Sequence, residues 1–361
     1  MMSKTSKPSP APIVGRGYTF HNCDTGRPLA GFAATLFFLE EDGRLKSGTG
    51  EYFCIDGTRN HEGQALTIFP LRNGRYHLMV DGKYLADTDE GYSPLASLAL
   101  QESNDLSACW YMTEKGQTPP LRIMMIGDSI THGTCCDDAS VHGIGCRKSL
   151  SEKLAENAEN RFVFVGSVKE HITACDQTAL YRHEGHPGWV AEDLFAKNTF
   201  SRGLVDRLDG WMGKYRPDVV LTQVGTNDTA FTMGKSGKEE PWTEEGMASV
   251  MASMELYWEK IWSMMPHHGA VVLATIPPTT RTQCFEDWIE ECNRRLPAVV
   301  ERWNGMGRKA VISHNHTFIS ESSPQKGTCS DMVHLSPVGY AAMAQAYYEA
   351  FTSLFPGTIG R

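Results

Sequence analysis

From Arg122 to the carboxyl terminus, short apolar runs alternate with longer helical stretches, and this alternation is the feature that most constrains the fold. Such a pattern is typical of parallel strands whose sheet is covered by helices on both faces. We therefore predict a flavodoxin-like three-layer α/β/α domain with a five-stranded parallel sheet. The expected strands are Arg122–Ile126, Arg161–Gly166, Asp218–Val224, Ala270–Ile276 and Lys309–Ser313.

Helices are expected between and after these strands. The predicted helices are Arg147–Asn157, a segment near Ser201–Tyr215, Gly246–Met265, Cys284–Trp303 and Pro337–Phe355. In an open parallel sheet, ligands bind at the carboxyl ends of the strands. Reactive residues should therefore lie on the loops that follow the strands.

The first third of the chain has a different pattern, with short β-like runs, turn dipeptides and almost no helical periodicity. The β-like runs are Ala34–Phe38, Glu51–Ile55, Ala65–Phe69 and Arg75–Val80, and Glu114–Pro120 resembles a linker. A chain of 361 residues is long enough for two cores. We predict a smaller all-β domain over residues 1–118 and a catalytic domain over residues 119–361.

The fold of the all-β domain is left open by its sequence. Tyr18–Gly31 and Tyr76–Asp87 share an aromatic residue, a turn and a closing leucine, which weakly resembles a β-trefoil repeat. Because only about two such units are visible, an immunoglobulin-like sandwich or an incomplete barrel remains open. The domain is expected to have an accessory role: it either binds sugar or forms one wall of the active site.

Charge and hydropathy narrow the range of partners. The net charge is −9, which disfavours nucleic acid, and apolar runs such as Ala270–Ile276 are too short to span a bilayer. The first residues, MMSKTSKPSPAPIVGRG, lack the apolar core of a secretory signal. The ten cysteines show no zinc-site spacing. We expect free thiols inside a cell, with disulfides in a secreted chain as the alternative; no pattern indicates an oligomeric state.

A serine follows the first predicted strand of the sheet, in Gly127-Asp128-Ser129. On a tight turn from strand to helix, such a serine is exposed to substrate and backbone N–H groups point toward the oxygen of the bond it attacks. The tripeptide alone is also compatible with a turn and a capping serine. Asp128 is expected to brace the turn rather than to act as an acid.

Two further motifs supply complementary chemistry. Asn227, after the third predicted strand in GTND, can donate its amide to a developing oxyanion, although it could also cap a helix. Asp331 and His334 stand three residues apart before the last helix, so the carboxylate can orient the imidazole as a general base. A surface aspartate and a satisfied histidine are the alternative for this last pair.

A fourth block, Glu184-Gly185-His186-Pro187-Gly188-Trp189, lies between the first two motifs in the chain. The four ordered blocks, within Arg122–Phe355, resemble those of the SGNH (GDSL-like) hydrolase family. This resemblance implies that Ser129 is the nucleophile, His334 the base and Asp331 its support. It also implies an oxyanion hole built from the N–H groups of Ser129 and Gly188 and the amide of Asn227.

The resemblance further implies that no cofactor and no metal take part. His183 and His186 are three residues apart, but neither has a carboxylate or cysteine partner at ligand spacing.

EGHPGW resembles the corresponding block of carbohydrate acetylesterases, especially the xylan-acetylesterase-like branch. We therefore expect a serine esterase that removes acetyl or other short acyl groups from a carbohydrate or small-molecule ester. His186 and Trp189 are the candidate substrate contacts, although Trp189 could equally be a core residue. The alternatives are a lipase-like, thioester or secondary-metabolite esterase, and a sugar-binding protein on an inactive hydrolase scaffold.

Overall fold

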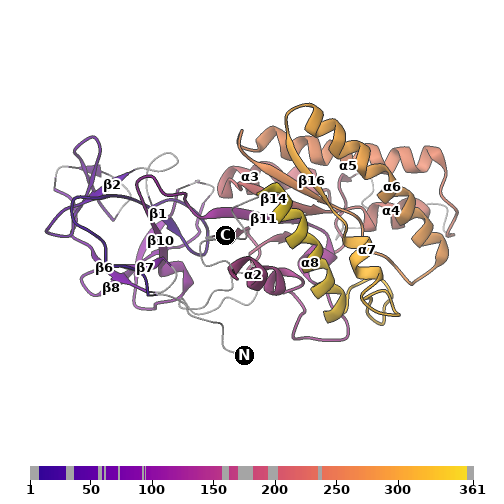
Figure 1. Ribbon diagram of the computed structural model, residues 1–361, viewed down its shortest axis with the longest axis horizontal. Helices are drawn as coiled ribbons and strands as arrows, with labels where there is room; N and C mark the ends of the chain where they lie inside the picture. Colours follow the sequence, from indigo (N-terminus) through magenta and orange to yellow (C-terminus); the bar gives the residue numbers. More distant parts are fainter. Residues whose placement is uncertain are drawn as a thin grey trace.

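The protein has two lobes, a β-rich amino-terminal lobe and a larger α/β lobe (Figure 1). The computed structural model describes residues 8–29, 36–55, 59–60, 62–71, 74–91, 93, 95–156, 162–169, 182–193, 202–234 and 238–355. The predicted boundary between residues 118 and 119 falls between β10 (Cys109–Glu114) and β11 (Leu121–Gly127), the last strand of the first lobe and the first strand of the second. The exact position of this boundary stays a prediction.

The larger lobe is built on a parallel sheet with the strand order β12-β11-β14-β15-β16. The predicted α/β fold with a parallel sheet is confirmed. The predicted count of five strands is not confirmed, because a further two-residue strand, β13, pairs in parallel with the end of β11. A two-residue strand has no periodicity that a sequence pattern can reveal. The strands beside β11 are β12 (Phe162–Val165), β13 (Glu184–Gly185), β14 (Val219–Gln223), β15 (Ala270–Ala274) and β16 (Lys309–Ser313).

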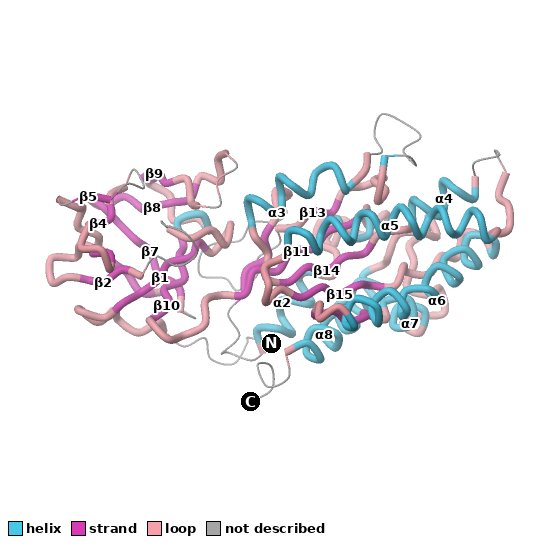
Figure 2. Tube along the Cα trace, turned by 90° about the horizontal axis from the view of Figure 1, so that it is seen from above, coloured by secondary structure: helices cyan, strands magenta, loops and turns pink. Residues whose placement is uncertain are grey.

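Helices cover both faces of this sheet, as Figures 1 and 2 show. Along β11, Met124 and Ile126 pack in one hydrophobic cluster, whereas Ile123 and Met125 pack in the other. This alternation gives both faces of the strand an apolar partner, which explains why the strand is apolar throughout. The first cluster includes α3 (Leu208–Tyr215), α5 (Glu244–Met264) and α6 (Gln283–Gly305); the second includes α2 (Arg147–Ala155) and α8 (Pro337–Leu354).

The long helices are close to their predicted ranges, and the differences lie at their ends. The predicted helix ends at Asn157 and Ser201, and the predicted strand start at Arg161, lie outside the described residues. Sequence periodicity missed the short helices, which are too brief to show a repeating apolar face. These are α1 (Ser129–His132), α4 (Thr226–Met233) and α7 (Asn315–Ser320), whereas η3 (Leu204–Arg207) lies within the helical segment predicted near Ser201–Tyr215.

The amino-terminal lobe is antiparallel throughout its described strand pairs. Its strands form a single hydrogen-bonded sheet with the order β5-β4-β3-β2-β1-β10-β7-β8-β9, and β6 also pairs with β7. A separate apolar cluster fills this lobe around Trp110, whose indole N–H donates to the Leu85 carbonyl at 2.8 Å. Besides β10, the strands are β1 (Gly17–Asn22), β2 (Phe37–Leu39), β3 (Leu45–Ser47), β4 (Tyr52–Phe53), β5 (Arg59–Asn60), β6 (Thr67–Pro70), β7 (Arg75–Val80), β8 (Lys83–Asp87) and β9 (Leu98–Gln101). A short helix, η1 (Leu106–Ala108), directly precedes β10.

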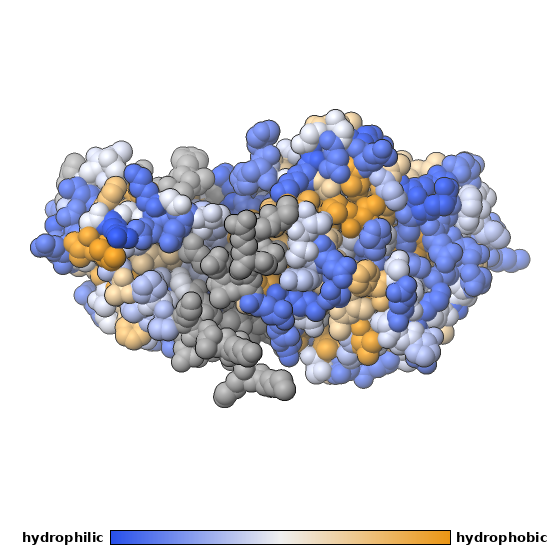
Figure 3. Space-filling view, viewed as in Figure 1, coloured by the Kyte–Doolittle hydropathy of each residue, from blue (hydrophilic) through white to orange (hydrophobic). Residues whose placement is uncertain are grey.

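Hydrophilic side chains dominate the visible face of the molecule, and apolar side chains gather in limited patches (Figure 3). Among the described residues, no helix combines the length and apolar character needed to cross a membrane.

Glycine at position 185 allows β13 to lie directly against α1. A Cβ added at Gly185 would come within 2.2 Å of the His132 nitrogen and 2.6 Å of its Cα. Because both atoms belong to the backbone, no rotamer change can relieve the overlap. A small residue is therefore required where these two segments meet.

Gly185→Ala is expected to lower the free energy of unfolding by about 1–3 kcal/mol, since overpacking forces the backbone to shift. Urea denaturation followed by circular dichroism measures this change. Gly213→Ala is the matched control: Gly213 lies exposed on α3 with no atom within 4 Å of an added Cβ. Alanine there should stabilise by up to about 1 kcal/mol. Equal effects of the two substitutions would contradict the close packing described for Gly185.

Candidate active site

The first feature of the site is the tight turn between β11 and α1. Asp128 is the N-cap of α1, and its side chain accepts a hydrogen bond from the Ile130 N–H at 2.9 Å. Gly127 lies so close to β14 that an added Cβ would be 2.0 Å from the Gln223 carbonyl oxygen. Ser129 therefore starts a helix at the carboxyl end of the sheet, and Asp128 braces the turn as the sequence indicated.

Ser129 is joined to two residues that stand far from it in the chain. The His334 Nε2 lies 2.8 Å from the Ser129 Oγ, and the His334 Nδ1 forms a short hydrogen bond with Asp331 Oδ2. Asp331 also accepts the backbone N–H groups of Val333 at 3.0 Å and His334 at 2.9 Å. The structure thus brings together the serine, histidine and aspartate that the motifs single out.

The charge of Asp331 fixes the direction of these hydrogen bonds. Burial alone would raise the pKa of Asp331, but the hydrogen bonds from His334, Cys136 and the backbone hold it far below its usual range. An ionised carboxylate can only accept, so the His334 Nδ1 carries a proton. When the imidazole is neutral, its Nε2 is then free to accept the hydroxyl proton of Ser129.

Cysteine side chains link the segment that follows α1 to the segment that carries Asp331. The Cys136 thiol donates to Asp331 Oδ2 at 3.1 Å, and this contact raises the pKa of Cys136 to about 11. The Sγ atoms of Cys135 and Cys329 lie 3.4 Å apart as free thiols. The contact between Cys136 and Asp331 could not be predicted from the sequence, because no local motif indicates it.

The predicted oxyanion donors lie on segments that are bonded to one another. Gly188 has φ +79°, a left-handed conformation that suits glycine. The Asn227 side-chain amide donates to the Trp189 carbonyl at 2.8 Å, which leaves its second N–H for another acceptor. Within the described residues, the N–H groups of Ser129 and Gly188 have no protein acceptor. For Ser129, this follows from its place at the start of α1.

His186 and Trp189, the predicted substrate contacts, belong to an aromatic stack. The ring of His186 lies between those of Trp189 and Trp211, with centroid distances of 4.4 and 4.7 Å. Its Nε2 is 3.1 Å from a carboxylate oxygen of the buried Glu184. Trp211, on α3, was missed by sequence analysis because it stands outside the four blocks.

Two buried carboxyl groups, Asp128 and Asp228, flank the site. Burial raises the pKa of Asp128 to about 6 and that of Asp228 to about 7, and the neighbouring Asp128 adds to the second shift. Asp228 accepts the Ala191 N–H at 3.0 Å and so ties the start of α4 to the segment after Trp189.

Among the residues that the structure describes, two groups of side chains have ligand atoms close enough to meet at a metal ion, within 4.8 Å of one another. The first consists of Cys136, Asp331 and His334, whose hydrogen bonds are already described. The second is Glu286, Glu290 and His316. Glu286 is already paired with Lys326 at 2.7 Å, so a cation there would have to displace an ammonium group.

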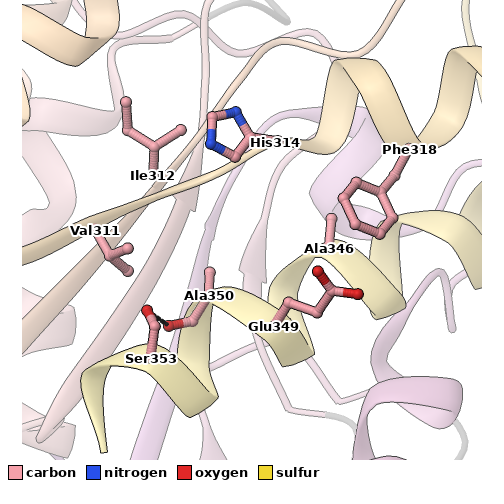
Figure 4. A pocket seen from close by; sticks show the side chains of 8 residues that line it. All are labelled: Val311, Ile312, His314, Phe318, Ala346, Glu349, Ala350 and Ser353. Carbon is pink, nitrogen blue, oxygen red and sulfur yellow. Dashed lines mark hydrogen bonds between the residues drawn. The ribbon is translucent and has the colours of Figure 1, made fainter.

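A pocket of about 240 Å³ lies apart from these residues, between β16, α7 and α8. Figure 4 shows its mixed lining of apolar and polar side chains. None of the lining residues belongs to the four sequence blocks. They are Val311, Ile312, His314, Phe318, Ala346, Glu349, Ala350 and Ser353.

Comparison with known proteins gives a consistent set of similarities. The model of the GDSL-like lipase/acylhydrolase family matches residues 125–342. A multidomain esterase of Ruminococcus flavefaciens is 24% identical over 245 residues, which cover 63% of this chain and 28% of that protein. The chain therefore matches just over a quarter of that relative's length.

Solved structures with a similar chain course include two family 3 carbohydrate esterases. The one from Talaromyces cellulolyticus is 23% identical to this chain, and the match has a TM-score of 0.47. It spans 65% of this chain and 97% of the chain in that structure. The one from Clostridium thermocellum is 20% identical to this chain, and the match also has a TM-score of 0.47. It spans 67% of this chain and 100% of the chain in that structure.

The buried Asp228 predicts a pH-dependent stability. Its folded pKa of about 7 exceeds the unfolded value of about 3.9, so the folded protein binds more protons between these values. Stability from this group therefore falls as pH rises from about 4 to 7. In Asp228→Asn this loss is absent, and the variant should gain about 1–3 kcal/mol relative to wild type between pH 5 and pH 8.

Urea unfolding of both proteins at each pH measures this gain. Asp209→Asn is the control, because the Asp209 side chain is 70% exposed and its substitution should give a nearly constant difference. A difference for Asp228→Asn that does not change with pH would show that Asp228 is ionised in the folded protein throughout this range.

Proposed function

Because the chain belongs to the GDSL-like lipase/acylhydrolase family, we propose that it hydrolyses carboxylic esters with Ser129 as nucleophile, His334 as general base and Asp331 as its support. The observation that carries this proposal is the 2.8 Å contact between the Ser129 Oγ and the His334 Nε2, with Asp331 on the other ring nitrogen. The preferred substrates we propose are acetyl or other short acyl esters of a carbohydrate or similar alcohol.

Acylation begins when the Ser129 Oγ attacks the ester carbonyl and its proton passes to the His334 Nε2. Asp331 stabilises the resulting imidazolium and keeps the ring oriented. The protonated His334 then gives its proton to the departing alcohol, and an acyl-serine remains. A water molecule, activated by His334 in the same way, attacks this acyl group and releases the acid.

The negative oxygen formed in each step needs donors that are already in place. We assign this role to the N–H groups of Ser129 and Gly188 and to the second N–H of Asn227. The hydrogen bond from Asn227 to the Trp189 carbonyl supports the assignment, because it ties the amide to the segment that carries Gly188.

The carbohydrate part of the proposal rests on the aromatic stack beside Gly188. Trp189 directly follows this glycine and is only partly buried, although it also packs against the hydrophobic core. Aromatic rings pack well on amphipathic partners, and the faces of sugar rings are such partners. Packing against His186 holds the Trp189 ring in one orientation, which lowers the entropy lost when a ligand binds.

Ser129→Ala is expected to lower kcat for nitrophenyl acetate by about 10⁴ or more, because only oxyanion and binding contributions remain. Ser140→Ala is the control, an exposed serine on the loop that follows α1, and it should keep full activity. A fluorophosphonate should label the wild type at Ser129, as located by mass spectrometry. Retention of more than about a tenth of the activity in Ser129→Ala would remove Ser129 from its proposed role.

A second prediction separates a sugar acetylesterase from a lipase-like or metabolite esterase. Rates on nitrophenyl esters should fall steeply from acetate to butyrate and longer chains. Trp189→Ala should slow the deacetylation of acetylated xylo-oligosaccharides more than that of nitrophenyl acetate, whereas Trp189→Phe should keep much of the sugar preference. Preference for octanoate, or an equal loss on both substrates in Trp189→Ala, would refute the carbohydrate assignment in favour of the alternative.

A further inference from the structure

We propose that the amino-terminal lobe positions the oxyanion segment of the larger lobe, and that Asp24 and Asp89 act through Arg182 as positioning residues. This inference rests on the proposed ester hydrolysis and on the assignment of Gly188 as an oxyanion donor. It gives the amino-terminal lobe a role in the reaction that does not require it to touch the substrate.

Arg182 stands at the start of the segment that leads to Gly188, and its side chain is 3% exposed. Its Nε and Nη2 donate to the two carboxylate oxygens of Asp24. Its Nη1 donates to Asp89 Oδ2 at 2.8 Å and to the Gly166 carbonyl at 2.9 Å. A planar guanidinium held at all three nitrogens has one orientation, and two carboxylates from the other lobe define it.

Asp89 is itself held firmly within the amino-terminal lobe. It adopts φ +61°, and its N–H donates to Asp87 Oδ1 at 3.0 Å. Asp87 is buried and bonded in turn to Arg27, whose Nε lies 2.8 Å from Asp87 Oδ2. Burial opposes ionisation of Asp89, but the charges and hydrogen bonds of Arg182 and Lys214 keep its pKa below the usual value. Asp89 therefore presents a fixed negative charge to the larger lobe.

The same carboxylate also holds the end of α3. Lys214 Nζ lies 2.9 Å from Asp89 Oδ1, and the Tyr215 hydroxyl donates to this oxygen at 3.2 Å. Figure 2 shows α3 on the side of the larger lobe that faces the amino-terminal lobe. Asp89 thus bonds two elements of the larger lobe, the segment that begins at Arg182 and α3.

Both elements lead to His186, close to the proposed oxyanion donor. From Arg182 the path is rigid: His183 exchanges two backbone hydrogen bonds with Val168, at 3.1 and 3.2 Å. β13 then pairs with β11, and the His186 N–H donates to the Gly127 carbonyl at 2.9 Å. From α3, Trp211 stacks on the ring of His186 with an interplanar angle of 7°.

The cost of losing a carboxylate explains why this network affects the reaction. A buried guanidinium that loses one of its two carboxylates is left with uncompensated charge, so Arg182 would move toward water or toward another acceptor. Its movement would shift the segment that carries Gly188. An oxyanion donor acts only within about 2.7–3.1 Å of the developing charge, so a small shift lowers kcat more than it weakens the binding of the uncharged ester.

Asp89→Asn tests this inference, because asparagine tolerates the left-handed conformation and the substitution therefore removes charge without forcing the backbone to change. On nitrophenyl acetate, kcat should fall on the order of 10-fold while KM changes by less than about twofold. A boronic acid, which forms a negatively charged tetrahedral adduct with Ser129, should lose affinity by a similar factor. All measurements are made at a temperature at which circular dichroism shows that the variant is fully folded.

Asp218→Asn is the matched control. Asp218 is also a poorly exposed carboxylate paired with an arginine, Arg122, at 2.9 Å, but it precedes β14 and so lies at the amino end of the strands. Asp218→Asn should lower the free energy of unfolding without lowering kcat. If Asp89→Asn does not fold, Asp24→Asn removes the other carboxylate of Arg182 and should give the same separation of kcat from KM.

Unchanged kcat and boronate affinity in a folded Asp89→Asn or Asp24→Asn would overturn the inference, as would an equal loss of kcat in Asp218→Asn. These results differ from a failure of the proposed function. In that case wild type itself would not hydrolyse nitrophenyl esters, or Ser129→Ala would hydrolyse them as fast as wild type does.

Discussion

The site depends on the side-by-side ends of β11 and β14. Gly127, the last residue of β11, is in register with Gln223, the last of β14, so the loops carrying Ser129 and Asn227 begin at the same edge of the sheet. The absence of a Cβ at Gly127 allows the contact with the Gln223 carbonyl. Every other part of the site is added to this edge: β13 pairs with the end of β11, and the segment bearing His334 reaches Ser129 from outside the sheet.

The carboxyl groups near this edge of the sheet differ in their environments, and their pKa values differ as a result. Asp331 is partly exposed and accepts several hydrogen bonds, which favours its charged form. Asp128 and Asp228 are fully buried, which favours their neutral forms. Asp331, the carboxylate bonded to the His334 Nδ1, therefore stays ionised to lower pH than the two buried groups do.

The residues whose proposed chemistry is local in the chain could be singled out from the sequence, and the structure brings them into contact. Asp331 and His334 are three residues apart, and Ser129 follows a strand that its apolar run reveals, so the motifs and the α/β pattern were sufficient for these residues. The family assignment from the four blocks is confirmed by the family match. Trp211 and Cys136 could not be found in this way, because their contacts join distant segments and leave no spacing pattern. Arg182 stands two residues before the start of the fourth block, but only the fold reveals its partners in the other lobe.

The shared ion network between the lobes limits how far the chain can be treated as modular. A catalytic lobe expressed alone would retain Arg182 and Lys214 but lose Asp24 and Asp89, leaving unpaired positive charge on a surface shaped for burial. A substitute β-domain joined at the same place would have to present two carboxylates in the same geometry to replace them. Exchange of domains between relatives is therefore constrained at this boundary. A fusion that keeps only the linker sequence does not keep the ion pairs of the interface.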